Sequence, residues 1–493
     1  MHNSQQDRAA LMSETADMIW ASYVNGRWLH EGETISLADP GDTGRIARQY
    51  YLASAGNVDE AVRAAAAVFP EWAETPPASR AAYVYDLIDL WRGRVDEIAK
   101  VVTQEMGKPF GEARSEAVRA IDEMRFWAGQ ALRLGDRTFE SARRHTEAYT
   151  IRQPIGPVAA ISPWNFPILS PIRKLIPGLI CGCPVVLKPA LQAPGASVIL
   201  FRLLEEVGLP AGVANLLIGS GRDVGDRLVR DPRIAGITFT GSTDIGIRLG
   251  TLAAERNART QLEMGGKNAA VVAGYADIEQ AAKEIANAAF GVSGQRCTAI
   301  SRVIVPEAER ADLEAALVAR VEALRVGYGL DEATDMGPLA SNEQVEKVRH
   351  YVGLAERGEG RVLTGGHDIN GDGYYYAPTV ITDVAPGSAL ATEEVFGPLL
   401  VVIPVADREQ AIQVNNEVRY GLASAVFTDD MNFAHAFTRS SQAGMVHVNH
   451  GTSSEGHLPF GGWKQSGQGA FGIGDTSAEF YTALKAVYRM HSG

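Results

Sequence analysis

The sequence predicts an α/β protein in which helices cover both faces of parallel sheets. Between residues 151 and 265, short apolar runs rich in β-branched residues alternate with amphipathic helical patterns. A second alternation of the same kind follows from about 267 to 465. The chain of 493 residues is too long for one hydrophobic core, and its length suggests roughly three domains.

Residues 54–142 predict mostly helix. The run AGNVDEAVRAAAAVFPEWAE begins with capping-type Asn and Asp and continues as an alanine-rich amphipathic pattern. The run PASRAAYVYDLIDLWRGRVDEIAKVVTQEMG keeps apolar residues at three- and four-residue spacing. A helical region therefore precedes the first sheet.

Five apolar runs predict the strands of the first sheet. They are GPVAAISPWN, PVVLKPA, ANLLIGS, GITFTGS and TQLEMGG, and helical patterns such as PIRKLIPGLICG and GASVILFRLLEEVG separate them. Because ligands of such sheets bind beyond the carboxyl ends of the strands, we look for functional residues at those ends.

The second series predicts another sheet and a small shared one. NAAVVAG, SRVIVPE, LLVVIPV and GLASAVFT indicate strands, and IEQAAKEIANAAFGV and residues 307–325 indicate helices. The run FYTALKAVYRM at 480–490 alternates as an edge strand does. With the polar TEAYTIRQP at 146–154, it could build a small sheet between subunits.

Composition excludes several classes of partner. The net charge of −13 and the pI near 5.4 argue against nucleic acid and anionic membranes, which need clustered Lys and Arg. Three cysteines form no disulfide framework and have no zinc spacing, so we expect no metal and a reducing, cytoplasmic location. The first twenty residues read as neither a signal peptide nor an anchor, and no stretch approaches the ~20 apolar residues of a spanning helix.

Cys297 lies in the polar stretch SGQRCTAIS and is a candidate nucleophile. A thiol reacts as the thiolate, so its pKa of ~8.5 must be lowered, and Arg296 next to it offers positive charge. An inert loop cysteine is the alternative. Cys181 and Cys183 in LICGCP are expected to be small buried residues.

Polar residues at two strand ends could assist such a thiol. Glu263 ends a strand before two glycines and could act as a general base, although a capping or surface Glu is the alternative. Asn165 in ISPWNFP could donate its amide N–H to a developing oxyanion, or could simply form a turn.

Other strand ends suggest a phosphate site. FTGSTDIG at 239–246 places Gly241 and Ser242 at the start of a helix, where free N–H groups attract a pyrophosphate. Lys188 ends the strand PVVLKPA and could reach a ribose hydroxyl. No GxGxxG motif follows the first strand.

Seven motifs together resemble the NAD(P)-dependent aldehyde dehydrogenase superfamily. ISPWNFP, LKPA, FTGSTDIG, LEMGGKN, GQRC, EEVFGP and PFGGWKQSG occur in that order between residues 161 and 467. The resemblance implies the aldehyde dehydrogenase fold and a homodimer or homotetramer. Its implied parts are a flexible N-terminus at 1–16, a Rossmann-like cofactor-binding domain at 17–135 and 155–265, a catalytic domain at 266–465, and an oligomerisation or bridging element at 136–154 and 466–493.

The resemblance also implies a mechanism and its residues. Cys297 would attack the aldehyde, Asn165 and the Cys297 N–H would hold the oxyanion, and Glu263 would activate the water that hydrolyses the thioester. Lys174 matches the family lysine near the active site. NAD or NADP would be bound by Ser162, Pro163, Trp164, Lys188, Gly221, Gly225, Phe239, Gly241, Ser242, Ile245, Met264, Gly265, Gln344, Glu394 and Phe396.

The chain departs from the family pattern at two places. Many members that prefer NAD carry a Glu three residues after the cofactor lysine, where this chain has Leu191, so we expect NADP to be tolerated. After PFGGWKQSG the family often has Arg-Glu, whereas this chain has Ala470 and Phe471. Deacylation would then rely on Glu263 alone.

Three arginines occupy positions that can line the substrate tunnel in the family, which suggests a small anionic aldehyde as substrate. A guanidinium grips a carboxylate in a bidentate way, so we expect an acid-tailed semialdehyde of the succinate semialdehyde or 2-oxoglutarate semialdehyde class. Alternatives are a phosphonate, phosphate or sulfonate aldehyde, arginines that only form salt bridges, a CoA-acylating or structural family member, and a cysteine hydrolase. The implied substrate residues are Arg119, Phe166, Arg173, Arg296, Thr298, Ser454 and Phe460.

Overall fold

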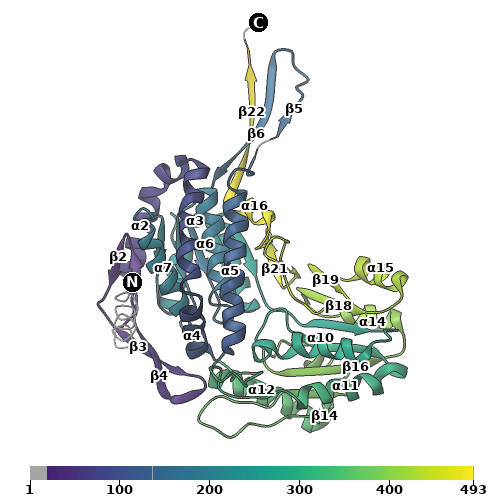
Figure 1. The fold of residues 1–493 in the computed structure, drawn as a ribbon. Helices are drawn as coiled ribbons and strands as arrows, with labels where there is room; N and C mark the ends of the chain where they lie inside the picture. Colours follow the sequence, from purple (N-terminus) through teal and green to yellow (C-terminus); the bar gives the residue numbers. More distant parts are fainter. Residues whose placement is uncertain (1–18, 136, 492–493) are drawn as a thin grey trace, which may run out of the picture.

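An eight-stranded sheet lies at the centre of one lobe of the computed structural model, which describes residues 19–135 and 137–491 (Figure 1). The expected flexible segment 1–16 lies outside the described residues. The five central strands run parallel, and antiparallel strands close both edges. In sheet order the strands are β2 (Arg27–Leu29), β1 (Ser22–Val24), β9 (Ala214–Leu216), β8 (Val185–Lys188), β7 (Val158–Ile161), β10 (Gly236–Thr240), β11 (Arg259–Glu263) and β21 (Gly467–Gly469).

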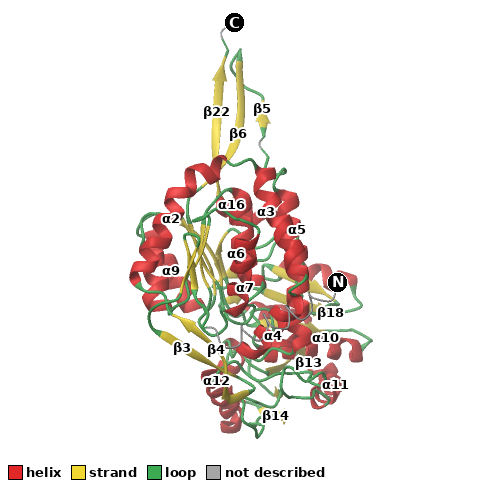
Figure 2. Ribbon diagram, turned by 60° about the vertical axis from the view of Figure 1, so that its left-hand side comes forward, coloured by secondary structure: helices red, strands yellow, loops and turns green. Residues whose placement is uncertain are grey.

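Helices cover both faces of this sheet (Figure 2). In β7, Val158 and Ala160 face one apolar core and Ala159 faces the other, because successive side chains of a strand point to opposite faces. This explains why the strand reads as a continuous apolar run. One face packs against α3 (Pro77–Arg92), α4 (Val95–Met106), α5 (Phe110–Gln130), α6 (Leu169–Cys181) and α7 (Gly195–Glu206), and the other against α2 (Ala55–Glu74), α8 (Asp226–Arg230) and α9 (Thr243–Ala254).

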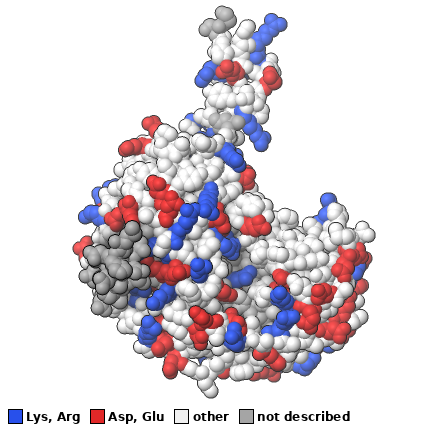
Figure 3. Space-filling view, viewed as in Figure 1, with Lys and Arg blue, Asp and Glu red and all other residues white. Residues whose placement is uncertain are grey.

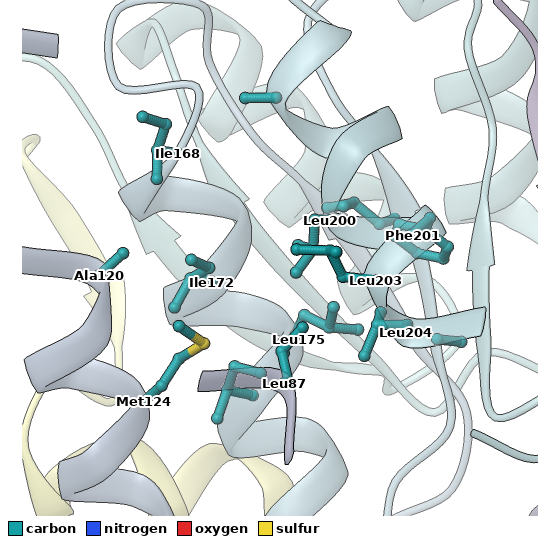
Figure 4. Close-up of a cluster of buried hydrophobic side chains, with 14 of the residues drawn as sticks. Leu87, Ala120, Met124, Ile168, Ile172, Leu175, Leu200, Phe201, Leu203 and Leu204 are labelled. Carbon is teal, nitrogen blue, oxygen red and sulfur yellow. The ribbon is translucent and has the colours of Figure 1, made fainter. Parts of the chain in front are cut away.

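The larger core fixes α5 and α6, the two helices that later contribute to the active site. Figure 4 shows Met124 of α5 and Ile172 of α6 pointing toward each other, with Leu87 of α3 beside them. Each of these three side chains is at most 1% exposed, and burying each contributes about 1.5–3 kcal/mol. The sheet face, α5 and α6 are therefore one rigid support.

Local capping residues set several helix ends. Ser54 caps α2 by accepting a hydrogen bond from the Asn57 N–H at 3.3 Å. Asp277 caps α10 (Ile278–Phe290) through the Gln280 N–H at 3.0 Å. Helix α6 ends at Gly182, whose φ of 89° suits glycine and allows the sharp entry into β8.

A seven-stranded sheet forms the second lobe. All of its pairings are parallel except β14 with β15. Its strands, in order, are β14 (Arg361–Thr364), β15 (Thr379–Thr382), β16 (Leu399–Val405), β13 (Ile300–Pro306), β12 (Asn268–Val272), β18 (Ala423–Phe427) and β19 (Met445–Val448). Helices α10 and α11 (Arg310–Glu322) cover one face, and α12 (Asn342–Leu354), α13 (Ala389–Thr392), α14 (Arg408–Asn416) and α15 (Met431–Ser440) cover the other. The predicted α/β class with parallel sheets is confirmed.

A three-stranded arm projects from the first lobe (Figure 1). It contains β5 (Thr138–Phe139), β6 (Thr146–Pro154) and β22 (Thr482–Met490), and β6 pairs with β22 along its whole length. The run expected as a strand from 480 begins instead with the end of α16 (Ala478–Tyr481), because Phe480 and Tyr481 are buried in the core. The segment from 466 onward also supplies β21, so it contributes to two sheets.

Smaller elements complete the described chain. A hairpin of β3 (Thr34–Asp39) and β4 (Asp42–Tyr51) flanks the first lobe, and β17 (Tyr420–Gly421) pairs with β20 (Trp463–Lys464). Positive and negative side chains are interspersed over the face seen in Figure 3. Within residues 19–135 and 137–491, no helix has the length and apolar character needed to cross a membrane, and no cluster of metal-ligating side chains occurs.

Candidate active site

A cavity of about 470 Å³ opens beyond the carboxyl ends of β7, β10 and β11 and is bounded by α5, α6 and the loop after α10. Cys297, Glu263 and Asn165 all line it. The other predicted site residues in its lining are Arg119, Pro163, Trp164, Phe166, Arg173, Lys174, Gly241, Ser242, Met264, Gly265, Arg296, Thr298, Gln344, Glu394, Phe396, Ser454 and Phe460.

Six predicted cofactor residues lie outside this lining, on neighbouring turns. The Ser162 N–H donates to the Lys188 carbonyl at 3.1 Å, which joins the ends of β7 and β8. Phe239 lies beneath Gly241, where a Cβ would come within 2.4 Å of the ring. Gly221 and Gly225 bound the turn before α8, and Ile245 is 47% exposed on α9.

The loop that carries Cys297 is held by side-chain amides. Asn165 Nδ2 donates to the Gln295 carbonyl at 2.8 Å, and Asn268 Nδ2 donates to the Cys297 carbonyl at 2.7 Å. A carboxamide has two N–H donors, so Asn165 keeps a second one for a ligand. These hydrogen bonds therefore hold the Cys297 loop and the Asn165 amide in fixed positions relative to each other.

The Cys297 thiol is not acidified in this environment. Burial and the carboxyl groups of Glu394 and Glu263 raise its pKa to about 12, and the lowering by Arg296 and Arg173 is smaller. The expectation that Arg296 would lower the pKa below its usual value is therefore wrong. The sulfur needs a base at the moment of attack.

Glu263 is placed to be that base. Its Oε1 accepts the Gly472 N–H at 3.1 Å, whereas its Oε2 accepts no hydrogen bond within the described part of the chain. Burial raises the pKa of Glu263 to about 8, and the nearby Lys174 partly opposes that rise. A carboxyl group with a pKa near 8 exchanges protons readily at neutral pH.

Lys174 belongs to a buried polar chain that leads away from Glu263. Its Nζ donates to Thr238 Oγ1 at 3.1 Å, and Thr238 donates to Gln261 Oε1 at 2.8 Å. Gln261 Nε2 in turn donates to the Phe471 carbonyl at 3.1 Å. Burial lowers the pKa of Lys174 to about 7. Phe471 takes part through its backbone carbonyl, so neutral groups extend this chain beyond Lys174.

Charged side chains at the far side of the cavity are mostly paired. Arg173 donates to Glu123 through Nε at 2.8 Å and Nη2 at 2.6 Å, and Lys108 pairs with Glu116 at 2.5 Å. Arg119 instead donates Nη2 to the Ser454 carbonyl at 2.8 Å. Its guanidinium has no carboxylate within salt-bridge distance in the described structure.

Sequence reasoning missed several of these charged residues. Glu112 and Glu116 were not predicted; they lie on α5 seven and three positions before the predicted Arg119, so the three share the helix face that lines the cavity. Lys347 of α12 also lines it. The helical spacing was a usable signal for the α5 residues.

Comparison with known proteins decides the family. The model of the Aldehyde dehydrogenase family matches residues 28–487. The chain belongs to the aldehyde dehydrogenase family. It is 38% identical over 475 residues to the alpha-ketoglutarate semialdehyde dehydrogenase of Haloferax volcanii, with 95% of this chain and 98% of that protein covered. It is 36% identical to the alpha-ketoglutaric semialdehyde dehydrogenase of Bacillus subtilis over 96% of this chain and 99% of that protein.

A solved structure extends the likeness to three dimensions. The betaine aldehyde dehydrogenase of Staphylococcus aureus, in complex with NAD+, superimposes with a TM-score of 0.94 at 29% identity. The match covers 98% of this chain and 97% of that one. The aldehyde dehydrogenase fold predicted from the seven motifs is confirmed.

The strand ends of this aldehyde dehydrogenase have room for a dinucleotide. Ser242 precedes α9 without a side-chain cap, so the first N–H groups of the helix are available to a pyrophosphate. The Gln344 Oε1 and Ser162 Oγ atoms are buried without a hydrogen-bond partner in the described structure. Glu394 lies so close to Gly265 that a Cβ there would come within 2.4 Å of its Oε2. These features fit an extended polar ligand.

Proposed function

We propose that the protein oxidises an acid-tailed semialdehyde of four or five carbons to the carboxylic acid, with NAD or NADP as oxidant. The observation that carries this proposal concerns Arg119. Its guanidinium lines the same cavity as Cys297 and has no carboxylate within salt-bridge distance in the described structure. The names of the relatives, which are dehydrogenases of alpha-ketoglutarate semialdehyde, support the same substrate class.

Cys297 and Glu263 divide the chemistry. The sulfur bonds to the carbonyl carbon as its proton passes to Glu263, because a thiol with a pKa of about 12 does not ionise unaided. The carbonyl electron pair moves to oxygen, where Asn165 Nδ2 and the Cys297 N–H would hold it. A nicotinamide bound in the cavity would accept the hydride.

Hydrolysis then uses the same carboxylate. Glu263 first loses the thiol's proton to solvent and then takes a proton from water as the hydroxide adds to the thioester. The carbon–sulfur bond breaks to release the acid, and the proton on Glu263 returns to the sulfur. Glu263 Oε2 accepts no hydrogen bond in the described structure, which supports this role. Lys174, when it is charged, lowers the pKa of Glu263 and would so increase the carboxylate fraction.

Arg119 is the residue we assign to the substrate's carboxylate. Arg173 is committed to Glu123. Arg296, like Arg119, donates to a backbone carbonyl, that of Thr452 at 3.2 Å, but its charge also faces the Glu112 carboxylate. An anion that reaches Arg119 gains a charge-assisted pair without breaking an existing ion pair.

Replacing Arg119 by alanine is expected to raise KM for succinate semialdehyde by about tenfold to a hundredfold, from ~1.5–3 kcal/mol of lost charged hydrogen bonding. The KM for hexanal should stay within about threefold, since hexanal has no anion to hold. Arg119→Lys, which keeps charge without the fork, should fall between the two. Steady-state NADH formation measures all three. If hexanal or benzaldehyde is the better substrate of the native enzyme, the acid-tail proposal is wrong.

The cofactor site is expected to accept both nucleotides. Leu191 packs against the apolar core and places no carboxylate beside Lys188, whose Nζ donates to the Pro189 carbonyl at 3.0 Å. No negative charge at this position repels a 2′-phosphate. We expect the kcat/KM values for NAD and NADP to differ by less than about a thousandfold, or ~4 kcal/mol. Leu191→Glu should lower the NADP value selectively, and a larger native preference for NAD would contradict the interpretation.

We also propose that the protein forms a homo-oligomer and lies in the cytoplasm. The projecting arm exposes Leu484, Tyr488 and Met490, which supports a homodimer or homotetramer built through this sheet. The cysteines Cys181, Cys183 and Cys297 are free, which fits the cytoplasm.

A further inference from the structure

We propose that Glu112 is a positioning residue for Cys297, an assignment that rests on the proposed role of Cys297 as nucleophile. Glu112 lies near the start of α5 and touches the loop that joins α10 to Cys297. It is 180 positions away from that loop in the sequence. No motif used to assign the function includes it.

The loop before Cys297 has an unfavourable backbone. Val292 (φ 55°, ψ 34°) and Ser293 (φ 54°, ψ 36°) adopt the left-handed conformation, and Gly294 follows with φ 70°. Such a conformation is rare for a β-branched residue such as Val292. It persists only where the surroundings hold it in place. The position of Cys297 therefore depends on contacts made by this loop.

Glu112 supplies the charged contact. The Val292 N–H donates to both of its carboxylate oxygens, at 3.0 and 3.2 Å. Ser293 Oγ donates to the Gly337 carbonyl at 2.7 Å, and Gln295 Oε1 accepts the Ala340 N–H at 2.9 Å. Those two contacts are between neutral groups, whereas a bond to a carboxylate is stronger.

Glu112 also faces the residue next to the nucleophile. A Cβ built on Gly291 would lie 3.2 Å from Arg296 Nη1 and 3.5 Å from Glu112 Oε1, so the two charged groups converge on the end of α10. Arg296 lowers the pKa of Glu112, although burial raises it overall. The carboxylate thus holds the loop by hydrogen bonds at Val292, the first left-handed residue, and acts through its charge on Arg296, which follows the left-handed residues.

Three variants separate the reach of the side chain from its charge. Glu112→Gln keeps an acceptor oxygen at the Val292 N–H, Glu112→Asp keeps the charge but shortens the reach, and Glu112→Ala keeps neither. Arg114→Ala is the matched control, because Arg114 is exposed on the same helix and makes only a surface ion pair with Asp96.

The measurement is single-turnover NADH formation with full-length enzyme in excess over succinate semialdehyde and saturating NAD. The rate constant reports thiol attack and hydride transfer. Because the aldehyde is limiting, the full amplitude equals the aldehyde added, and far-UV circular dichroism of each variant reports the folded fraction. We expect Glu112→Ala and Glu112→Asp to lower the rate constant about tenfold or more at full amplitude, since small displacements of a nucleophile are costly. Glu112→Gln, which keeps a weaker neutral acceptor at the Val292 N–H, should fall between Glu112→Ala and the native enzyme, and Arg114→Ala should match the native enzyme.

A second substrate separates positioning from substrate binding, because Glu112 also lines the cavity. With hexanal, the Ala and Asp variants should slow by the same factor as with succinate semialdehyde. A role in repelling or orienting the anion would change the two aldehydes differently and would overturn the assignment.

The remaining outcomes also decide the question. Native rate constants in Glu112→Ala, or in Glu112→Asp if the alanine variant does not fold, overturn the proposal. A slow Glu112→Gln beside a normal Glu112→Asp would mean that charge alone matters, which also overturns it. If Cys297→Ala remains active, the proposed function itself fails. If Cys297→Ala is inactive while every Glu112 variant reacts normally, only the present inference fails.

Discussion

Cys297→Ala is expected to lower kcat by roughly 10⁴-fold or more, because the thioester route disappears with its nucleophile. NADH absorbance with succinate semialdehyde measures the loss. Dissociation constants for NAD and NADP should change little, since the residues proposed to hold the dinucleotide do not include Cys297.

The matched control for this experiment is Cys181→Ala. Cys181 is 3% exposed in the core, and burial raises its pKa far above that of an ordinary thiol. Its loss should reduce stability, not the turnover of folded enzyme. Turnover that survives Cys297→Ala would contradict the covalent mechanism.

Glu263→Gln is expected to lower steady-state turnover by about 10²–10⁴-fold, the usual worth of a general base. Thiol attack needs the base once and hydrolysis needs it again, so both steps should slow. Single-turnover NADH formation measures the first step, and release of the carboxylic acid measures the second. Native turnover in Glu263→Gln would refute the assignment.

The pH profile tests the same residue. Only the carboxylate form of Glu263 accepts a proton, and its pKa is raised to about 8. The hydrolysis rate should therefore rise with pH up to about 8 and fall at lower pH. Because Lys174 lowers the pKa of Glu263, Lys174→Met should move this limb to higher pH. A limb that stays in place would show that Lys174 does not act on the base.

Much of the arrangement of the active site was predictable, because the ends of its strands can be recognised in the sequence. The runs ending at Ile161, Lys188 and Glu263 are apolar and β-branched, and parallel strands bring their carboxyl ends to one edge. The polar residues that follow them were therefore expected to lie together. In contrast, β21 is a three-residue strand with two glycines and has no strand pattern to detect.

The electrostatics of the cavity were less predictable because they depend on tertiary pairing. Arg173 finds Glu123 fifty positions away, on another helix, so its charge is largely balanced. The pKa of Cys297 depends on burial and on Glu394, which the sequence around SGQRCTAIS does not contain. The left-handed backbone at Val292 and Ser293 likewise has no local signature, since neither residue favours it.

The return of the chain's last segment to the first sheet has a consequence for biosynthesis. β21 pairs with β11 through Glu263, and the Gly472 N–H binds the carboxylate of that same residue. A ribosome-bound chain that lacks this segment has a general base without its neighbouring strand or its hydrogen-bond donor. Catalytic competence should therefore arise only after the segment that carries β21 and Gly472 has been synthesised and has paired with β11.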